Sequence, residues 1–322
     1  MARALSRRLS AQLLLLCVVF IWGSSFVVVK DALRDISPLL FNLIRMCLAF
    51  LCLAVFYRGH IGRINRRAVV SGGVVGFCLA IGYAFQTTGL ALTTPSKSAF
   101  ITGFSVVLVP LLAATPGLRP ANAVPPRWNA WTGALLAFAG LTLLTAPARS
   151  AAAGVSPAAA LIGLDFGGIN LGDLLTLGCA LGFALHIIAL AHTSPRVPFE
   201  QLALLQVGFC AAFMAIGTPL LEHAFIRLTL HLAAAFIIAA VLATAAAFTI
   251  QSWAQRYLAP TQTALLLALE PVFAAFTSLV VLGERLSLRA SLGALLILAG
   301  IALTELVPYP VQPTTHEALP QQ

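Results

Sequence analysis

Long apolar segments without charged residues follow one another along almost the whole chain, and they limit the fold more than any other feature. A helix needs roughly 20 apolar residues to cross a bilayer core of about 30 Å. The chain of 322 residues is 60% hydrophobic and only 9% charged, whereas soluble domains carry about 25% charged residues. The segments are continuously apolar, unlike the alternating strands of a membrane barrel. We therefore predict an all-α polytopic membrane protein.

The segments predict ten transmembrane helices. We expect them near residues 9–29, 38–57, 68–92, 95–116, 128–147, 171–193, 199–221, 228–253, 258–283 and 288–307. Arg3, Arg7 and Arg8 precede the first segment, as in a signal peptide. That segment is longer than an h-region of about 7–15 residues, and no cleavage motif of small residues follows it. We therefore interpret it as a retained first helix.

Basic residues in the loops predict the orientation. If the N-terminus is inside, the inner loops hold more arginines and lysines than the outer ones, chiefly because of the first half of the chain. Cytoplasmic loops of membrane proteins carry such an excess. We expect a multi-pass protein of the inner (cytoplasmic) membrane with both termini in the cytoplasm. The net charge of +9 forms no basic stripe with interleaved aromatics, so we expect no nucleic-acid partner.

The two halves of the chain resemble each other. Gly133-Ala-Leu-Leu-Ala-Phe-Ala-Gly140 matches Gly293-Ala-Leu-Leu-Ile-Leu-Ala-Gly300 at an offset of 160 residues, and Gln86 and Pro95 match Gln251 and Pro260 at an offset of 165. Shared Ala and Leu composition is the alternative explanation, so the paired Gly, Gln and Pro carry the argument. Copies of five helices each must insert in opposite senses. Secondary transporters often have such inverted repeats, with the substrate site between them near the midplane.

These observations predict the domain organisation. Residues 9–147 form the first repeat, residues 148–170 a linker rich in Ala, Gly, Ser and Pro, and residues 171–307 the second repeat. The tail 308–322 contains four prolines in a polar sequence, and we expect it to be disordered.

Five short motifs resemble the EamA-type, ten-helix branch of the drug/metabolite transporter superfamily. They are Trp22-Gly-Ser-Ser-Phe26, Asn42-Leu-Ile-Arg45, Pro95-Ser-Lys-Ser-Ala-Phe-Ile-Thr-Gly103, Leu269-Glu-Pro-Val-Phe273 and Leu282-Gly-Glu-Arg-Leu286. The resemblance covers the chain from about residue 10 to 305. It implies a carrier of small metabolites, often an exporter of amino acids or related compounds. The first half departs from the pattern because Pro116-Gly-Leu-Arg119 replaces the Gly-Glu-Arg motif.

Glu270 is the candidate coupling residue. It lies ten residues after Pro260, so about 15 Å along its helix and close to the midplane. A charged side chain there costs roughly 2.5–3.5 kcal/mol on insertion scales, and Pro271 opens the helix locally by removing a donor. One interpretation is a proton-binding carboxylate that couples transport to a proton gradient. The other is a structural glutamate that hydrogen-bonds neighbouring helices around the proline.

Two basic residues within the spans are candidates for contact with substrate. Arg45 lies about 10 Å from the outer end of the second span. It binds a substrate carboxylate, extends to the interface, or pairs with an acid such as Glu270. Lys97 opens the fourth span, where it either attracts anionic groups at the cavity mouth or anchors the helix at the interface.

Polar and aromatic side chains within other spans complete the candidate cavity. His186 either joins helices by a hydrogen bond or relays protons. Gln86 and Gln251 occupy matched positions and either line the cavity or clamp helices together. The candidate cavity set further comprises Trp22, Asn42, Tyr83, Gln206 and Trp253. A mixed polar and aromatic lining suits small amphipathic solutes.

Other classes of function lack their signatures. The sequence contains no Walker loop, HExxH, GxSxG or ion-channel filter repeat. We predict a non-enzymatic efflux-type secondary transporter without metal or cofactor, whose partners are the lipid bilayer, a small-molecule substrate and a coupling proton. The alternative is a membrane protein without transport activity, either an enzyme or a channel. The sequence is compatible with both a monomer and a homodimer. We interpret the spacing Gly72-x-x-x-Gly76 first as a contact between helices of the same chain.

Overall fold

The computed structural model describes residues 2–93, 95–120, 125–145, 170–273, 276–277 and 288–306. The predicted linker and tail therefore lie almost entirely outside the described residues, as does the Leu282 to Leu286 motif. The described part is all-helical, with only an isolated bridge between Ile36 and Ile226. The all-α prediction is confirmed for these residues.

The described part of the first half contains seven helices, whose boundaries largely follow the apolar segments. They are α1 (Ala2–Ala32), α2 (Pro38–Phe56), the short α3 (Arg58–Ile61), α4 (Arg66–Leu92), α5 (Pro95–Gly103), α6 (Ser105–Ala114) and α7 (Trp128–Thr145). Pro38 and Asn65 explain two of the starts. Proline fits the first turn of a helix, where no amide donor is needed, and the Asn65 side chain caps α4 by accepting from the Ala68 amide at 2.9 Å.

The described part of the second half is also entirely helical. It contains α9 (Leu171–Thr193), α10 (Phe199–Leu221), α11 (Leu230–Ile237), the π-helix η2 (Ile238–Ala246), α12 (Ala247–Ala254), α13 (Pro260–Leu267) and α15 (Leu288–Leu306). Six helices in the described part are long and apolar enough to cross a membrane: Ser6–Ala32, Pro38–Phe56, Arg66–Leu92, Leu171–Thr193, Phe199–Leu221 and Leu230–Ala254. Ser98–Ala114 and Ser291–Thr304 are shorter apolar helices.

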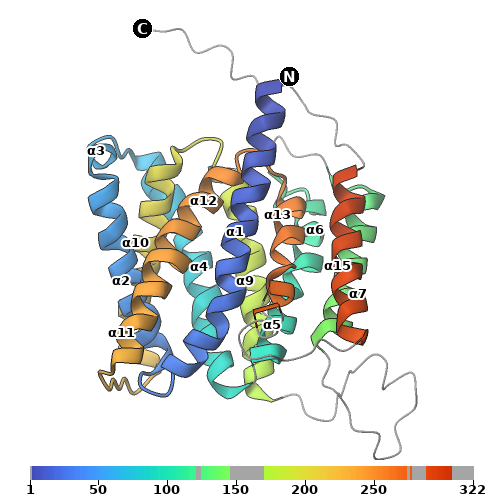
Figure 1. Cartoon of the computed structure of the whole chain (residues 1–322). Coiled ribbons are helices and arrows are strands. Elements are labelled where there is room, and N and C mark those ends of the chain that lie inside the picture. The colour runs from blue at the N-terminus through green and yellow to red at the C-terminus, as the bar shows by residue number, and fades with distance from the viewer. Residues whose placement is uncertain are drawn as a thin grey trace, which may run out of the picture.

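The helices stand side by side in one bundle (Figure 1). The pair α7 and α15 forms one edge, α2 and α10 pack together near the opposite edge, and α4 packs along α9. Many large apolar side chains face outward, and Leu230 and Phe56 are 87% and 81% exposed. A soluble surface does not carry apolar residues on this scale, whereas a lipid-facing one does. The outer faces are therefore suited to contact the bilayer.

Hydrogen bonds at one end of the bundle join helix ends and helix starts from both halves. Lys30 at the end of α1 donates to the carbonyls of Leu90 and Thr93 at 2.6 and 3.0 Å. Thr93, which follows α4, donates to Asp173 in the first turn of α9 at 2.8 Å. Glu222, which follows α10, accepts from the backbone amide of Leu40 in α2 at 2.7 Å. We call this end the Lys30 face.

The opposite end, which we call the Arg256 face, has a similar network. Arg256, which follows α12, donates to the carbonyls of Ser194 and Val197 after α9 at 2.8 and 2.9 Å. His192 near the end of α9 bonds the carbonyl of Leu118 after α6 at 2.8 Å. Hydrogen bonds therefore connect the ends of helices at both faces.

Glycines bring α7 and α15 into close contact. A Cβ atom added to Gly140 would overlap the carbonyl oxygen of Gly293, and one added to Gly300 would overlap that of Gly133. The two helices therefore cross antiparallel at backbone distance. Gly72 and Gly76 likewise pack on α10, against Leu205 and the Gln206 carbonyl. The prediction that this glycine pair serves intramolecular packing is confirmed.

Candidate functional site

A polar cavity of about 80 Å³ lies inside the bundle, between helices of both halves. The first half contributes α1, α2, α4, α5 and α6, and the second contributes α9, α12, α13 and the turn after α13. One buried water needs only about 10–15 Å³ of such space, so the cavity has room for several waters. Most of the predicted site residues line it: Trp22, Arg45, Tyr83, Gln86, His186, Gln251 and Glu270.

Three other predicted residues, Asn42, Gln206 and Trp253, are not among those that line the cavity. Asn42 lies behind the wall, where its amide donates to the Tyr83 carbonyl and to Thr87 at 3.0 Å each. Gln206 also lies behind the wall. Trp253 packs against Tyr257 and is not among the residues that line this cavity, so its predicted role in the site stays a prediction. The side chain of Lys97 lies outside what the structure describes, and its role stays a prediction.

Arg45 is held in the wall by three hydrogen bonds. Its Nε donates to Thr244 Oγ1 at 2.6 Å, and its Nη2 donates to Tyr83 Oη at 3.0 Å and to the Ala243 carbonyl at 3.1 Å. The guanidinium also lies over the Tyr83 ring, 4.5 Å from its centroid. Arg45 is only 4% exposed, so it does not extend to the interface. It forms no ion pair with Glu270, because no such contact occurs within 4.0 Å.

The π-helix η2 supplies the acceptors for Arg45. A π-helix shifts backbone hydrogen bonds to residues five apart and often occurs at functional sites. Ala243 within it accepts from both Arg45 and the Trp22 indole, the latter at 2.8 Å. Thr244 donates in turn to the Ala239 carbonyl at 2.7 Å. These bonds connect α1 and α2 to the middle of the eighth predicted span.

His186 is the first member of a short hydrogen-bonded chain. Its Nε2 lies 2.9 Å from Gln206 Oε1, and Gln206 Nε2 donates to Ser252 Oγ at 2.8 Å. With this amide orientation, Nε2 of His186 carries a proton and Nδ1 is an acceptor in the neutral ring. The chain joins α9, α10 and α12. It is the helix-joining bond expected of His186, and proton relay by His186 stays a prediction.

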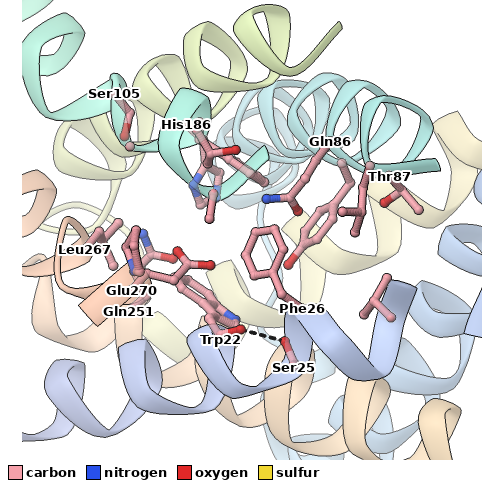
Figure 2. Close-up of a pocket in the computed structure, with 18 of the residues that line it drawn as sticks. Trp22, Ser25, Phe26, Gln86, Thr87, Ser105, His186, Gln251, Leu267 and Glu270 are labelled. Atoms are coloured by element: carbon pink, nitrogen blue, oxygen red, sulfur yellow. Dashed lines mark hydrogen bonds between the residues drawn. The ribbon is translucent and has the colours of Figure 1, made fainter. Parts of the chain in front are cut away.

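Glu270 and Gln251 reach the cavity with unused hydrogen-bonding groups. The structure records no hydrogen bond from the Glu270 carboxylate to any described residue, so the predicted structural clamp around Pro271 is not seen. Gln251 is 1% exposed, and its Oε1 has no partner. Figure 2 shows both side chains beside Trp22 at one end of the cavity, with Gln86 and Thr87 at the other end and Phe26 between them. Buried polar groups without partners are uncommon, and a ligand is one way to satisfy them.

Two helix breaks border the cavity, one in each half of the chain. The fourth predicted span breaks at Phe104, between α5 and α6, and the ninth breaks at Ala268 and Leu269 after α13. Pro271 contributes to the second break because it cannot donate to the Leu267 carbonyl. Discontinuous helices of this kind line substrate sites in many transporters.

Sequence reasoning missed the residues at the first break and most of the aromatic wall. Ser105 lines the cavity, and the offset of 165 residues would have paired it with Glu270. Phe26, Phe183 and Phe248 also line the cavity. Phe26 ends one of the five motifs, but no sequence signal distinguished Phe183 and Phe248, because phenylalanine inside an apolar run is equally suited to lipid or to a helix contact. Among the described residues, no group of three or more His, Cys, Asp or Glu side chains is arranged to hold a metal ion.

The fold and the cavity together define a multi-pass helical membrane protein with a cavity between its helices that polar and aromatic side chains line. Comparison with known families agrees, since the EamA-like transporter family matches residues 9–146 and 170–306. The chain belongs to this family of membrane transporters, which confirms the resemblance seen in the motifs.

Individual relatives are consistent with this assignment. An "Uncharacterized transporter" of Archaeoglobus fulgidus is 32% identical over 300 residues, which cover 93% of this chain and 87% of the relative. A second "Uncharacterized transporter" of the same organism is 23% identical over 91% of this chain and 96% of its own length. A solved structure described as "Crystal structure of protein" has a TM-score of 0.69 at 19% identity, over 92% of this chain and 96% of that one. At that identity, it shows the fold alone.

Proposed function

We propose that the protein is a secondary transporter that carries small metabolites across the cytoplasmic membrane by alternating access, with the cavity as its substrate site. The observation that carries this proposal is the cavity itself. Both halves of the chain contribute to its walls, and the polar side chains of Gln86, Gln251 and Glu270 are among the residues that line it. Because one chain supplies these walls, a single copy suffices as the transport unit in a monomer or a homodimer. We propose export as the direction, on the family resemblance.

We further propose ten membrane spans arranged as two inverted repeats, residues 9–147 and 171–307. The helix ends support this arrangement. At the Lys30 face, α1 ends where its counterpart α9 begins, and α10 ends where its counterpart α2 begins. The matched α7 and α15 cross antiparallel through Gly140 and Gly293. In this architecture, the substrate site lies at the repeat interface and one bundle rocks against the other.

Reconstituted flux tests this function. Purified protein in proteoliposomes should accelerate the movement of its substrate, chosen by comparing metabolites of cells with and without the protein. Flux that saturates with substrate concentration, and that the gradient of a second solute can drive, supports a carrier. Flux that never saturates would instead indicate a channel, and chemical conversion of the solute would indicate an enzyme.

A matched pair of variants locates the transport path. Gln251→Cys should react with a hydrophilic thiol reagent, and substrate should slow that reaction, because Gln251 lines the cavity. Trp253→Cys, two residues further along the same helix, packs against Tyr257 outside the cavity and should not respond to substrate. Equal responses at both positions would contradict the assigned site.

A further inference from the structure

One cationic side chain lines the described cavity wall, and no carboxylate neutralises it directly. Arg45 is 4% exposed, and no Asp or Glu oxygen of the described residues lies within 4.0 Å of its guanidinium. A buried charge without a partner is costly in a protein within a membrane. Among the described residues, the Arg45 guanidinium therefore has no direct counter-ion, and the acid on the same cavity, Glu270, lies beyond ion-pair distance.

The guanidinium has one unused edge. Nε and Nη2 use their N–H groups on Thr244, Tyr83 and the Ala243 carbonyl, and the Tyr83 ring covers one face of the group. Nη1 makes no hydrogen bond to any residue that the structure describes. A guanidinium group has five N–H donors and no acceptor, so Nη1 offers its two remaining donors in a fixed position.

The rest of the cavity wall suits an organic molecule rather than an inorganic ion alone. Aromatic rings of Trp22, Phe26, Phe183 and Phe248 line it. Gln86 also lines it, and its side chain makes no hydrogen bond within the described chain. An apolar or aromatic body would fit between these rings, with a polar end at Arg45.

We propose that the substrate is an organic anion whose carboxylate, or a similar oxyanion, binds Nη1 of Arg45. Charge-assisted hydrogen bonds of arginine to carboxylate are about twice as strong as neutral ones. Thr244 and the Ala243 carbonyl act as positioning groups, because they fix the guanidinium without touching the substrate. This inference rests on the proposed function, since it names the substrate class of the same cavity.

Glu270 connects this binding to pH. The titratable or charged groups that line the described cavity are Arg45, Tyr83, His186 and Glu270. An ionised Glu270 opposes the substrate anion electrostatically, whereas a protonated Glu270 leaves Arg45 and the anion as a neutral pair. Anion affinity should therefore rise as pH falls. Glu270→Gln should remove this dependence, and His186→Gln should keep it.

Binding of phenylacetate to the purified full-length protein in detergent tests the proposal. Thermal unfolding is measured over a titration of phenylacetate, of its neutral isostere phenylacetamide and of the cationic phenethylamine. We expect saturable stabilisation by phenylacetate alone. Equal stabilisation by phenylacetamide, or none by phenylacetate, would overturn the proposal. A parallel titration of chloride distinguishes an inorganic anion, because binding of chloride without phenylacetate also overturns the assignment of an organic substrate.

Variants assign the binding to Arg45. Arg45→Gln should weaken phenylacetate binding about tenfold or more, as expected when a hydrogen bond to a charged group is lost. Thr244→Val should also weaken phenylacetate binding, whereas Thr244→Ser should retain it because the hydroxyl acceptor for Arg45 is kept. This second pair of variants tests the proposal even if Arg45→Gln fails to fold. Arg34→Gln, an exposed arginine outside the cavity, is the control. Wild-type affinity in both Arg45→Gln and Thr244→Val would contradict the inference.

Flux measurements separate this inference from the proposed function. A protein that binds phenylacetate through Arg45 but supports no saturable flux would contradict transport and leave the anion site in place. Saturable flux of a neutral or cationic substrate, unaffected by Arg45→Gln, would contradict the anion site and leave transport in place.

Discussion

Arg45 and Glu270 are ionisable residues on the same cavity, but the structure gives them different surroundings. Arg45 is fixed by three hydrogen bonds from two helical segments, so its position is set before any ligand arrives. Glu270 has no hydrogen bond to the described residues. A fixed cation is suited to bind a ligand, whereas a carboxylate without partners can gain and lose a proton with little rearrangement.

Glu270→Gln should uncouple transport from the proton gradient. The neutral amide resembles the protonated carboxyl group in size but releases no proton, so exchange of substrate across the membrane should continue while uphill transport driven by a pH gradient is lost. Proteoliposomes with and without an imposed pH gradient measure both activities. Full proton-driven accumulation by the variant would exclude the coupling role of Glu270.

Gln206→Leu should destabilise the protein by about 1–3 kcal/mol, the usual cost of leaving a buried polar group unpaired. The substitution removes the partner of His186 Nε2 and of Ser252. His186→Gln should instead keep a hydrogen bond and leave the pH profile of transport unchanged. Thermal unfolding and pH-dependent flux of the two variants check this pair, and an altered pH profile in His186→Gln would point to proton relay.

Helix interruptions near the cavity are the main feature at the level of the elements. Two predicted spans that looked continuous in sequence are broken, at Phe104 and at Leu269, and the eighth span contains the π-helix η2. Each irregular segment either contributes residues to the cavity wall or hydrogen-bonds a residue that lines it. Backbone groups that leave regular hydrogen bonding need other partners in a membrane, and η2 finds them in Trp22 and Arg45.

The packing of α7 on α15 gives a second prediction at this scale. Gly140→Ala should lower stability by about 1–3 kcal/mol, a typical cost of overpacking, because the added methyl group overlaps the Gly293 carbonyl. Gly117→Ala is the matched control, since an added Cβ there meets nothing within 4 Å. Melting temperatures of the two purified variants provide the measurement. Equal melting temperatures would mean that α7 and α15 accommodate the added methyl group without loss of stability.

At the scale of the whole molecule, hydrogen bonds join helix ends at both faces of the bundle. The Lys30 face joins the ends of α1, α4 and α10 to the starts of α2 and α9, and the Arg256 face joins the ends of α6, α9 and α12. In the proposed alternating access, each set of contacts would open in turn. The cavity would then face one side of the membrane at a time.

The proposed orientation predicts which residues can be labelled from outside the cell. In a background without native cysteines, Arg34→Cys and Arg227→Cys should react with an impermeant thiol reagent on intact cells, because both lie at the Lys30 face. Arg63→Cys and Arg196→Cys lie at the Arg256 face and should react only after permeabilisation. The reverse pattern would place the N-terminus outside, and the same pattern at all four positions would contradict a fixed orientation.

Much of the fold and part of the site could be predicted from the sequence. The spans expected at residues 38–57, 171–193 and 199–221 agree with α2, α9 and α10 to within a residue, because the cost of placing polar residues in lipid sets where an apolar segment begins and ends. The same cost allowed ionisable residues within the spans, such as Arg45, His186 and Glu270, to be recognised as candidates.

Other features were decided only by the tertiary structure. Trp253 was assigned to the cavity, but the face that α12 turns inward carries Gln251 instead, and sequence alone does not fix the rotation of a helix with apolar residues all round. Phe183 and Phe248 became cavity walls through packing between helices distant in sequence. The apolar pattern thus determined which segments are helical, whereas contacts between helices determined where those helices break and which side chains meet.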